Sequence, residues 1–218
     1  MSDVPASLKP RLRGVSHQYA FFVAVVLGAL LVARAPAGAG TVATAVYALG
    51  FCGLFGVSAL YHRVTWGPRA QGWMRRLDHS MIFVFIAASY TPVAVLVLDG
   101  TAATVVLAVV WGGAAAGVIL KLVWISAPRW LSALLYVALG WVAVATLPDQ
   151  WSSLGWLAVA AFGAGGVLYT AGAVVYARGR PDPWPRVFGY HEVFHALVIA
   201  AAAIHFAVIA LAVVVPGA

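Results

Sequence analysis

The segment His191-Glu192-Val193-Phe194-His195 matches H-E-x-x-H, the pattern with which metalloproteases hold zinc. Side chains four residues apart on a helix share a face, so His191 and His195 could direct two imidazole nitrogens to one metal ion. The run 196–215 that follows is almost entirely apolar and long enough to cross a bilayer. A soluble protease would not hold its zinc helix in such a run. The pattern therefore predicts a metal site in a membrane protein.

A third imidazole is available from another segment. Ser58 and His62 stand four residues apart at the end of an apolar stretch, so a helix places them on one face. Zinc binds imidazole nitrogen at about 2.0 to 2.1 Å, and three protein ligands leave a fourth position open, as in catalytic sites. We therefore predict a Zn2+ site whose ligands are His62, His191 and His195.

Two carboxylates are candidates for the chemistry. Zinc lowers the pKa of its bound water to about 7, and a nearby carboxylate can orient that water or accept its proton. Asp78, at the start of the third apolar segment, is the first candidate for this catalytic role, and Glu192 is the second. Ser58 is the candidate for positioning a ligand or a substrate carbonyl. These residue types favour hydrolysis.

The same residues also have structural interpretations. Asp78 at a helix start could cap free N–H groups, and Ser58 could bond back to its own helix. The histidines could simply join helices through hydrogen bonds. His17 is expected to be solvated near the tail. His205 lies about 21 Å along the helix from His191, too far to share the metal, and is expected to be a core histidine.

The composition predicts an all-α, polytopic membrane protein. Hydrophobic residues make up 64% of the 218 residues and charged residues 9%, against about 45 to 50% and about 25% in globular proteins. The net charge of +7 then indicates membrane orientation, with the lipid bilayer as partner and no nucleic acid. The single cysteine, Cys52, excludes an internal disulfide.

Gly and Pro breakers divide the chain into seven apolar segments, which predict seven transmembrane helices. The predicted spans are 18–33, 41–61, 78–98, 101–122, 130–147, 152–177 and 191–215. Residues 1–17 would be a short basic cytoplasmic tail, and residues 18–217 a single transmembrane domain. No room is left for a separate soluble domain.

The basic residues are distributed unequally between the two ends of these spans. Twelve of the 13 Lys and Arg residues fall before residue 18, at the end of span four (Lys121), or in the connections that follow spans two, four and six. Only Arg34 falls on the other side. The positive-inside rule therefore predicts a cytoplasmic N-terminus, an outer C-terminus, and a candidate site near the inner face.

Four separated motifs resemble those of the hemolysin III family, the bacterial branch of the progestin and adiponectin receptor family. They are Ser58-Ala59-Leu60-Tyr61-His62, Leu77-Asp78-His79-Ser80, Ser89-Tyr90-Thr91-Pro92 and His191-Glu192-Val193-Phe194-His195. The resemblance implies seven helices and a zinc near the inner face, bound by His62, His191 and His195. It also implies that Asp78 contacts the zinc through water and that Ser58 is the motif serine.

Adiponectin-receptor relatives are associated with ceramidase-like hydrolysis. The resemblance therefore implies a zinc-dependent hydrolase of the cell membrane that acts on a lipid amide or ester carrying an acyl chain. The alternative is a non-enzymatic hemolysin III-type protein, a cytolysin, sensor or regulator of membrane homeostasis, with a structural zinc. A third interpretation, an intramembrane protease that uses Asp99, conflicts with topology, because Asp99 is expected about 30 Å away at the outer face.

Overall fold

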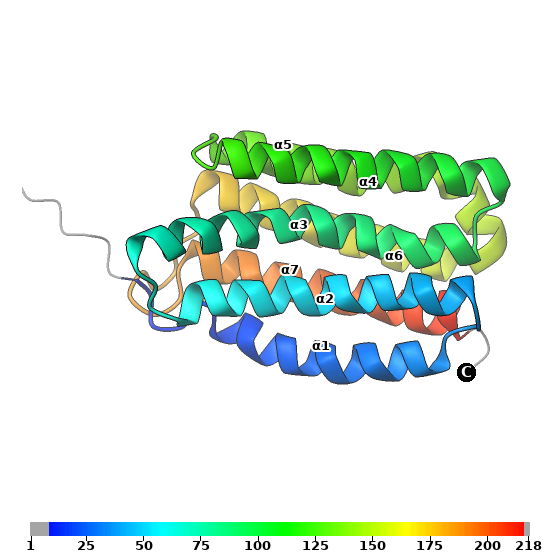
Figure 1. Ribbon diagram of the computed structural model, residues 1–218, viewed down its shortest axis with the longest axis horizontal. Coiled ribbons are helices and arrows are strands. Elements are labelled where there is room, and N and C mark those ends of the chain that lie inside the picture. Colours follow the sequence, from blue (N-terminus) through cyan, green and yellow to red (C-terminus); the bar gives the residue numbers. More distant parts are fainter. Residues whose placement is uncertain (1–8, 216–218) are drawn as a thin grey trace, which may run out of the picture.

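Long helices run side by side along the molecule (Figure 1). The computed structural model describes residues 9–215, which contain helices and turns but no strand. The elements in chain order are α1 (Val15–Arg34), α2 (Ala39–Arg63), α3 (Pro68–Leu96), α4 (Gly100–Val123), α5 (Arg129–Gly140), the 3-10 segment η1 (Trp141–Thr146), α6 (Leu147–Arg178), α7 (Tyr190–Val208) and the π-helical segment η2 (Ile209–Val214). The predicted all-α class is confirmed.

Six segments of the described chain are long and apolar enough to cross a membrane. The chain is therefore a multi-pass membrane protein, as predicted. The fifth of these segments, Arg129–Arg178, contains both of the spans predicted at 130–147 and 152–177. Seven separate crossings remain a prediction.

The fifth segment is bent rather than continuous. Gly155 has a φ of 78° and a ψ of 166°, a conformation that only glycine adopts readily, and it interrupts α6. The main part of α6 then runs back along the bundle against α5 (Figure 1). With η1, α5 rises about 30 Å, which equals the thickness of the hydrocarbon layer. This geometry supports one crossing on each side of the bend.

Helix α3 begins ten residues earlier than the predicted span. Gly67 and Pro68 start it, and proline suits the first turn because it has no N–H to leave unpaired. The segment 69–77 contains three arginines and a glutamine, and it was therefore predicted to be a connection. Asp78 consequently lies about three turns inside the helix, so the interpretation of Asp78 as a helix cap is wrong.

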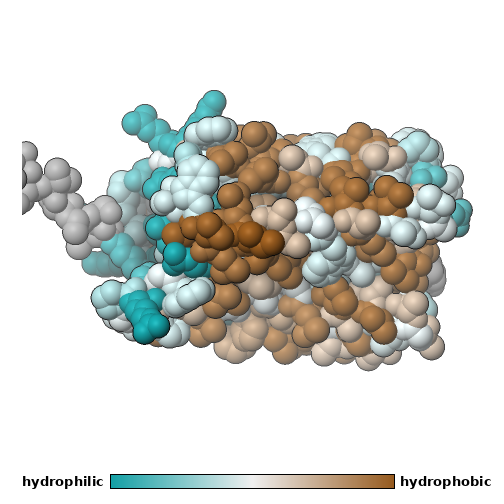
Figure 2. Space-filling view, turned by 45° about the horizontal axis from the view of Figure 1, so that its top comes forward, coloured by the Kyte–Doolittle hydropathy of each residue, from teal (hydrophilic) through white to brown (hydrophobic). Residues whose placement is uncertain are grey.

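Hydropathy divides the surface along the long axis. Figure 2 shows apolar residues over the body of the molecule and hydrophilic residues concentrated at one end. This is the end at which α2 terminates and α3 and α7 begin (Figure 1). The arrangement matches an apolar band in the bilayer flanked by an interfacial region rich in basic side chains.

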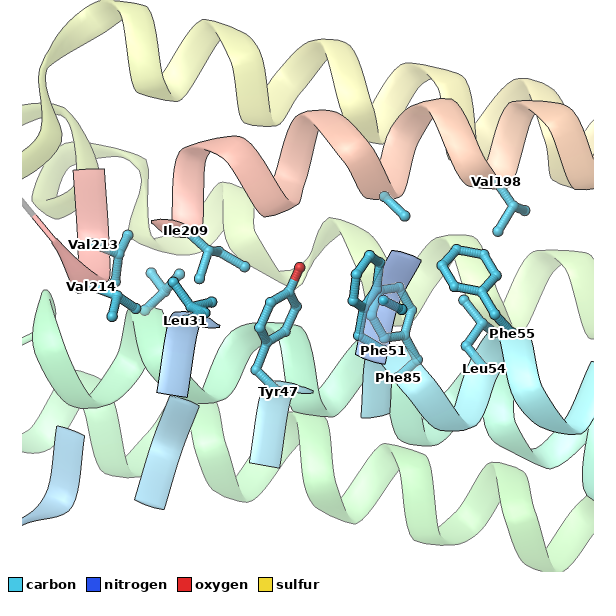
Figure 3. Packing of buried hydrophobic residues seen from close by; sticks show 13 residues of the cluster. Leu31, Tyr47, Phe51, Leu54, Phe55, Phe85, Val198, Ile209, Val213 and Val214 are labelled. Carbon is cyan, nitrogen blue, oxygen red and sulfur yellow. The ribbon is translucent and has the colours of Figure 1, made fainter. Parts of the chain in front are cut away.

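An aromatic cluster joins the helices that carry the candidate site. Phe51 of α2 packs against Phe85 of α3 and Phe206 of α7, with ring centroids 6.1 and 5.6 Å apart. Figure 3 shows Tyr47, Phe51 and Phe55 of α2 directed toward the helix that carries Val198 and Ile209. These ring contacts hold α2, α3 and α7 against one another, so they also fix the relative positions of residues nearer the hydrophilic end of the three helices.

Candidate metal centre

Three histidines meet at the hydrophilic end of the bundle. His62 lies in the last turn of α2, and His191 and His195 lie in the first turns of α7. One ring nitrogen from each of the three lies within 4.8 Å of the other two. His62 and His195 are buried, at 6% and 2% exposed. The cluster could hold a metal ion, as the sequence predicted.

Two of the three donors are spaced almost as in a tetrahedral metal site. Nitrogen ligands at about 2.0 to 2.1 Å from a tetrahedral metal lie roughly 3.3 to 3.4 Å from each other. The Nε2 atoms of His62 and His191 are 3.1 Å apart. The Nδ1 atom of His195 is buried without a hydrogen-bond partner. Two facing nitrogens must share a proton or a cation, and the pair is spaced so that one metal ion could bind both.

Asp78 lies beside this cluster. Its Oδ2 is 4.0 Å from Nε2 of His62 and 3.7 Å from Nδ1 of His79. The ring of His79 is held elsewhere, with Nδ1 2.8 Å from the carbonyl of Arg75 and Nε2 3.1 Å from the hydroxyl of Tyr176. A separation of 4.0 Å is too long for direct contact and suits a bridging water.

Glu192 is directed away from the histidines. Its Oε2 accepts the backbone N–H of Gly189 at 2.8 Å, which completes a capping box at the start of α7. Its Oε1 forms an ion pair with Arg13. The side chain is 2% exposed, and both oxygens are engaged. These contacts give Glu192 a role in holding the helix start.

Ser58 contacts a histidine that the motifs did not indicate. Nδ1 of His17 is hydrogen-bonded to Oγ of Ser58 at 2.9 Å. The His17 ring stacks on His195 at a centroid distance of 3.7 Å and is 3% exposed. The expectation that His17 is solvated was therefore wrong. Helix α1 starts at Val15 and packs against α7, which carries this ring into the interior.

The segment 9–14 crosses the same end of the bundle. The backbone N–H of Arg11 donates to the carbonyl of Arg186 at 3.0 Å. The Lys9 ammonium donates to the carbonyl of His62. Partial burial, and then the nearby charges of Arg13 and Arg63, lower the pKa of Lys9 from its usual value. The segment 9–14 therefore contacts His62, one of the three candidate metal ligands.

Gly14 provides a test of this contact. A Cβ atom at Gly14 would lie 2.5 Å from Cβ of His62, and its φ is +79°. Gly14→Ala is expected to displace His62 and weaken zinc binding about tenfold or more. Chelator competition on the purified protein measures this affinity.

Gly38→Ala is the matched control. Gly38 has a similar φ of +76°, but nothing lies within 4 Å of its Cβ position. Gly14 is in the left-handed α region, whereas Gly38 has a ψ of −125° and lies outside it. Both substitutions carry a backbone penalty of about 1 to 3 kcal/mol, so both should lower the melting temperature. An equal change in zinc affinity in the two variants would show that the contact with His62 is unimportant.

A cavity of about 360 Å3 extends from this end into the bundle. Its polar end is lined by His17, Ser58, Asp78, His191 and His195. The remainder is mostly apolar, with side chains from α3, α5, α6 and α7. The volume is in the range of small-molecule sites. The candidate metal centre therefore faces a largely apolar space within the bundle.

Comparison with known proteins supplies the family. The profile of the family described as "Haemolysin-III related" matches residues 6–206. The chain belongs to the haemolysin III-related family. This match includes every candidate site residue, and it confirms the resemblance predicted from the four motifs.

Two haemolysin III relatives are similar over most of their length. The "Hemolysin-3 homolog" of Bacillus subtilis (strain 168) is 27% identical over 160 residues, covering 73% of this chain and 72% of the relative. "Hemolysin-3" of Bacillus cereus is 27% identical over 165 residues, covering 76% and 72%. Membership of the haemolysin III-related family therefore applies to the transmembrane bundle as a whole.

Proposed function

We propose that this protein is a zinc-dependent integral-membrane hydrolase that acts on a lipid amide or ester near the cytoplasmic face. The observation that carries the proposal is the convergence of His62, His191 and His195 beside Asp78 at the polar end of an apolar cavity. Three imidazole ligands with an open position are typical of catalytic zinc. An apolar cavity that ends at such a site suits a substrate with an acyl chain.

Asp78, Ser58 and the cavity each have a separate role in the proposed hydrolysis. When bound, zinc would supply an acidified water and polarise a carbonyl. Asp78 is suited to orient that water and accept its proton, because one water molecule can bridge its Oδ2 and Nε2 of His62. Ser58 holds His17 against the ring of His195 and so keeps that ligand in place. The cavity holds the acyl chain and excludes bulk water.

The orientation of the chain is part of the proposal. With the basic end in the cytoplasm, the N-terminus lies inside, and seven crossings would put the C-terminus outside the cell membrane. The bend at Gly155 supports the seventh crossing. The candidate metal centre then lies at the inner leaflet, and a lipid of that leaflet is the proposed partner.

Metal removal tests the proposal. The full chain, purified in detergent, is expected to contain about one zinc per molecule and to hydrolyse ceramide. Chelation should abolish turnover, and added Zn2+ should restore it. Mg2+, which prefers oxygen ligands, should not restore it. Turnover that persists after the zinc has been removed would contradict the proposal.

The hemolysin names of the two relatives favour one alternative, a non-enzymatic cytolysin. In that case the zinc would be structural, as part of the bundle end. Purified protein that lyses blood cells without releasing a lipid product, whether or not chelator is present, would support the cytolysin and exclude the hydrolase.

A further inference from the structure

Tyr169 carries an unpaired hydroxyl deep in the bundle. It lies on α6 and lines the cavity, and its hydroxyl is buried with no hydrogen-bond partner. A buried hydroxyl without a partner destabilises a protein, because it has lost its hydrogen bonds to water and gained none in return. Such a group in a membrane interior calls for a partner that the chain does not supply.

Other polar side chains of this part of the cavity already have partners. The hydroxyl of Tyr90 donates to the carbonyl of Gly140 at 2.5 Å. Gln150 donates to Thr146 at 2.8 Å. The hydroxyl of Thr170 donates to a carbonyl of its own helix at 2.8 Å. Tyr47 of α2 also has a buried hydroxyl without a partner, but Tyr47 does not line this cavity. Tyr169 is therefore the unpaired hydroxyl in this part of the cavity lining.

His205 of α7 packs against Tyr169 and also lines the cavity. The two ring centroids are 5.3 Å apart at an angle of 78°. Nε2 of His205 lies 3.0 Å from the carbonyl oxygen of Phe162. A carbonyl oxygen only accepts, so Nε2 carries the hydrogen and Nδ1 of the neutral ring is an acceptor. The Tyr169 hydroxyl can therefore donate a hydrogen bond, and Nδ1 of His205 can accept one.

The pair is separated from the metal centre by a defined length. His195 and His205 both line the cavity, ten residues apart on α7, which corresponds to about 15 Å. With carbon–carbon bonds of about 1.5 Å in an extended zigzag, roughly twelve bonds span that distance. An extended acyl chain whose carboxyl end lies at the metal centre therefore reaches the pair roughly twelve carbons from that end.

We propose that Tyr169 and His205 form a binding site for a hydroxyl group on the acyl chain of the substrate. A hydroxyl both donates and accepts, which matches this pair; an oxo group only accepts, and a methylene does neither. The inference rests on the proposed lipid hydrolase and adds to it a preference for mid-chain hydroxylated acyl groups.

Binding of fatty acids to the zinc-loaded, full-length protein tests this preference. Octadecanoic acid with a hydroxyl roughly twelve carbons from its carboxyl should bind about tenfold tighter than plain octadecanoic acid. An oxo group at that position should give an intermediate affinity, and a hydroxyl next to the carboxyl should give no gain. Titration calorimetry in detergent measures each affinity.

Two variants assign the gain to the pair. Tyr169→Phe removes only the hydroxyl and should abolish the tenfold gain while leaving plain octadecanoic acid unchanged. Gly165→Ala should do the same, because its Cβ would lie 2.3 Å from Cδ2 of His205 and displace the ring. Gly112→Ala in α4 is the control, because nothing lies within 4 Å of its Cβ position and Gly112 does not line the cavity; it should keep the gain.

The outcomes separate this inference from the proposed function. Equal affinity of the wild-type protein for hydroxylated and plain acids would overturn the inference and leave the hydrolase intact. An equal loss of affinity for both acids in Tyr169→Phe would assign the hydroxyl to the structure of the bundle and also overturn the inference. If neither acid bound, the proposal that the cavity holds an acyl chain would be overturned, and the inference with it.

Discussion

His191→Ala is expected to remove zinc from the protein and to abolish lipid hydrolysis. His191 Nε2 lies 3.1 Å from Nε2 of His62, so its loss leaves two imidazoles where three converge. Loss of a group that merely supports a ligand costs 10-fold to 100-fold in affinity, and loss of the ligand itself should cost more than about 100-fold. Zinc content by atomic absorption and ceramide turnover, measured on the same sample, check both parts.

Val193→Ala controls for truncation of a side chain in the same helix. Val193 lies in α7 between the two histidines but is not part of the metal cluster. It should keep both zinc and turnover. If His191→Ala lost its zinc but still turned over ceramide, hydrolysis would not depend on zinc and the proposed function would be excluded. Retained zinc would instead exclude His191 as a ligand.

Asp78→Asn is expected to keep zinc but to lower turnover by about 100-fold to 10,000-fold. Asparagine has the same shape as aspartate, but its amide cannot accept the proton of the water. Because Asp78 lies 4.0 Å from His62 and contributes no atom to the three-histidine cluster, zinc affinity should change little. Zinc content and the rate at saturating ceramide separate the two effects.

Glu192→Gln provides the matched contrast, since it makes the same chemical change within the H-E-x-x-H pattern. Glutamine can still accept the N–H of Gly189, but Arg13 loses its charged partner. We expect a loss of about 1 to 3 kcal/mol in stability, seen as a lower melting temperature, with turnover per folded molecule retained. If turnover fell as far as in Asp78→Asn, Glu192 would have to be the proton acceptor.

The convergence of the three histidines could be predicted because it depends on topology alone. Charge placement put the end of one span and the start of another at the same depth, and His62 and His191 lie at those ends. The position of Asp78 beside them followed from the same reasoning. The packing angles that bring these helix ends within bonding range are set by side chains such as Phe51 and Phe85, which no motif specifies.

Other features were beyond reach of the sequence. His17 belongs to no motif, and only its depth at the start of the first span could have indicated the site. The three arginines of the segment 69–77 are typical of a connection, yet this segment extends α3 beyond the apolar region. The carboxylate of Glu192 matched a protease pattern, but its partner Arg13 is far away in sequence and becomes a neighbour only in the folded bundle.

The length of α3 determines where in the bilayer a bond could be cut. From Asp78 to its last residue, Leu96, the helix rises about 27 Å, close to the hydrocarbon thickness of about 30 Å. When Leu96 lies at one boundary of the hydrocarbon, Asp78 lies at the other, level with the linkages that join headgroups to acyl chains. A lipid would then need to move sideways but not out of the membrane. The concentration that governs its hydrolysis would be its mole fraction in the bilayer, rather than its amount in solution.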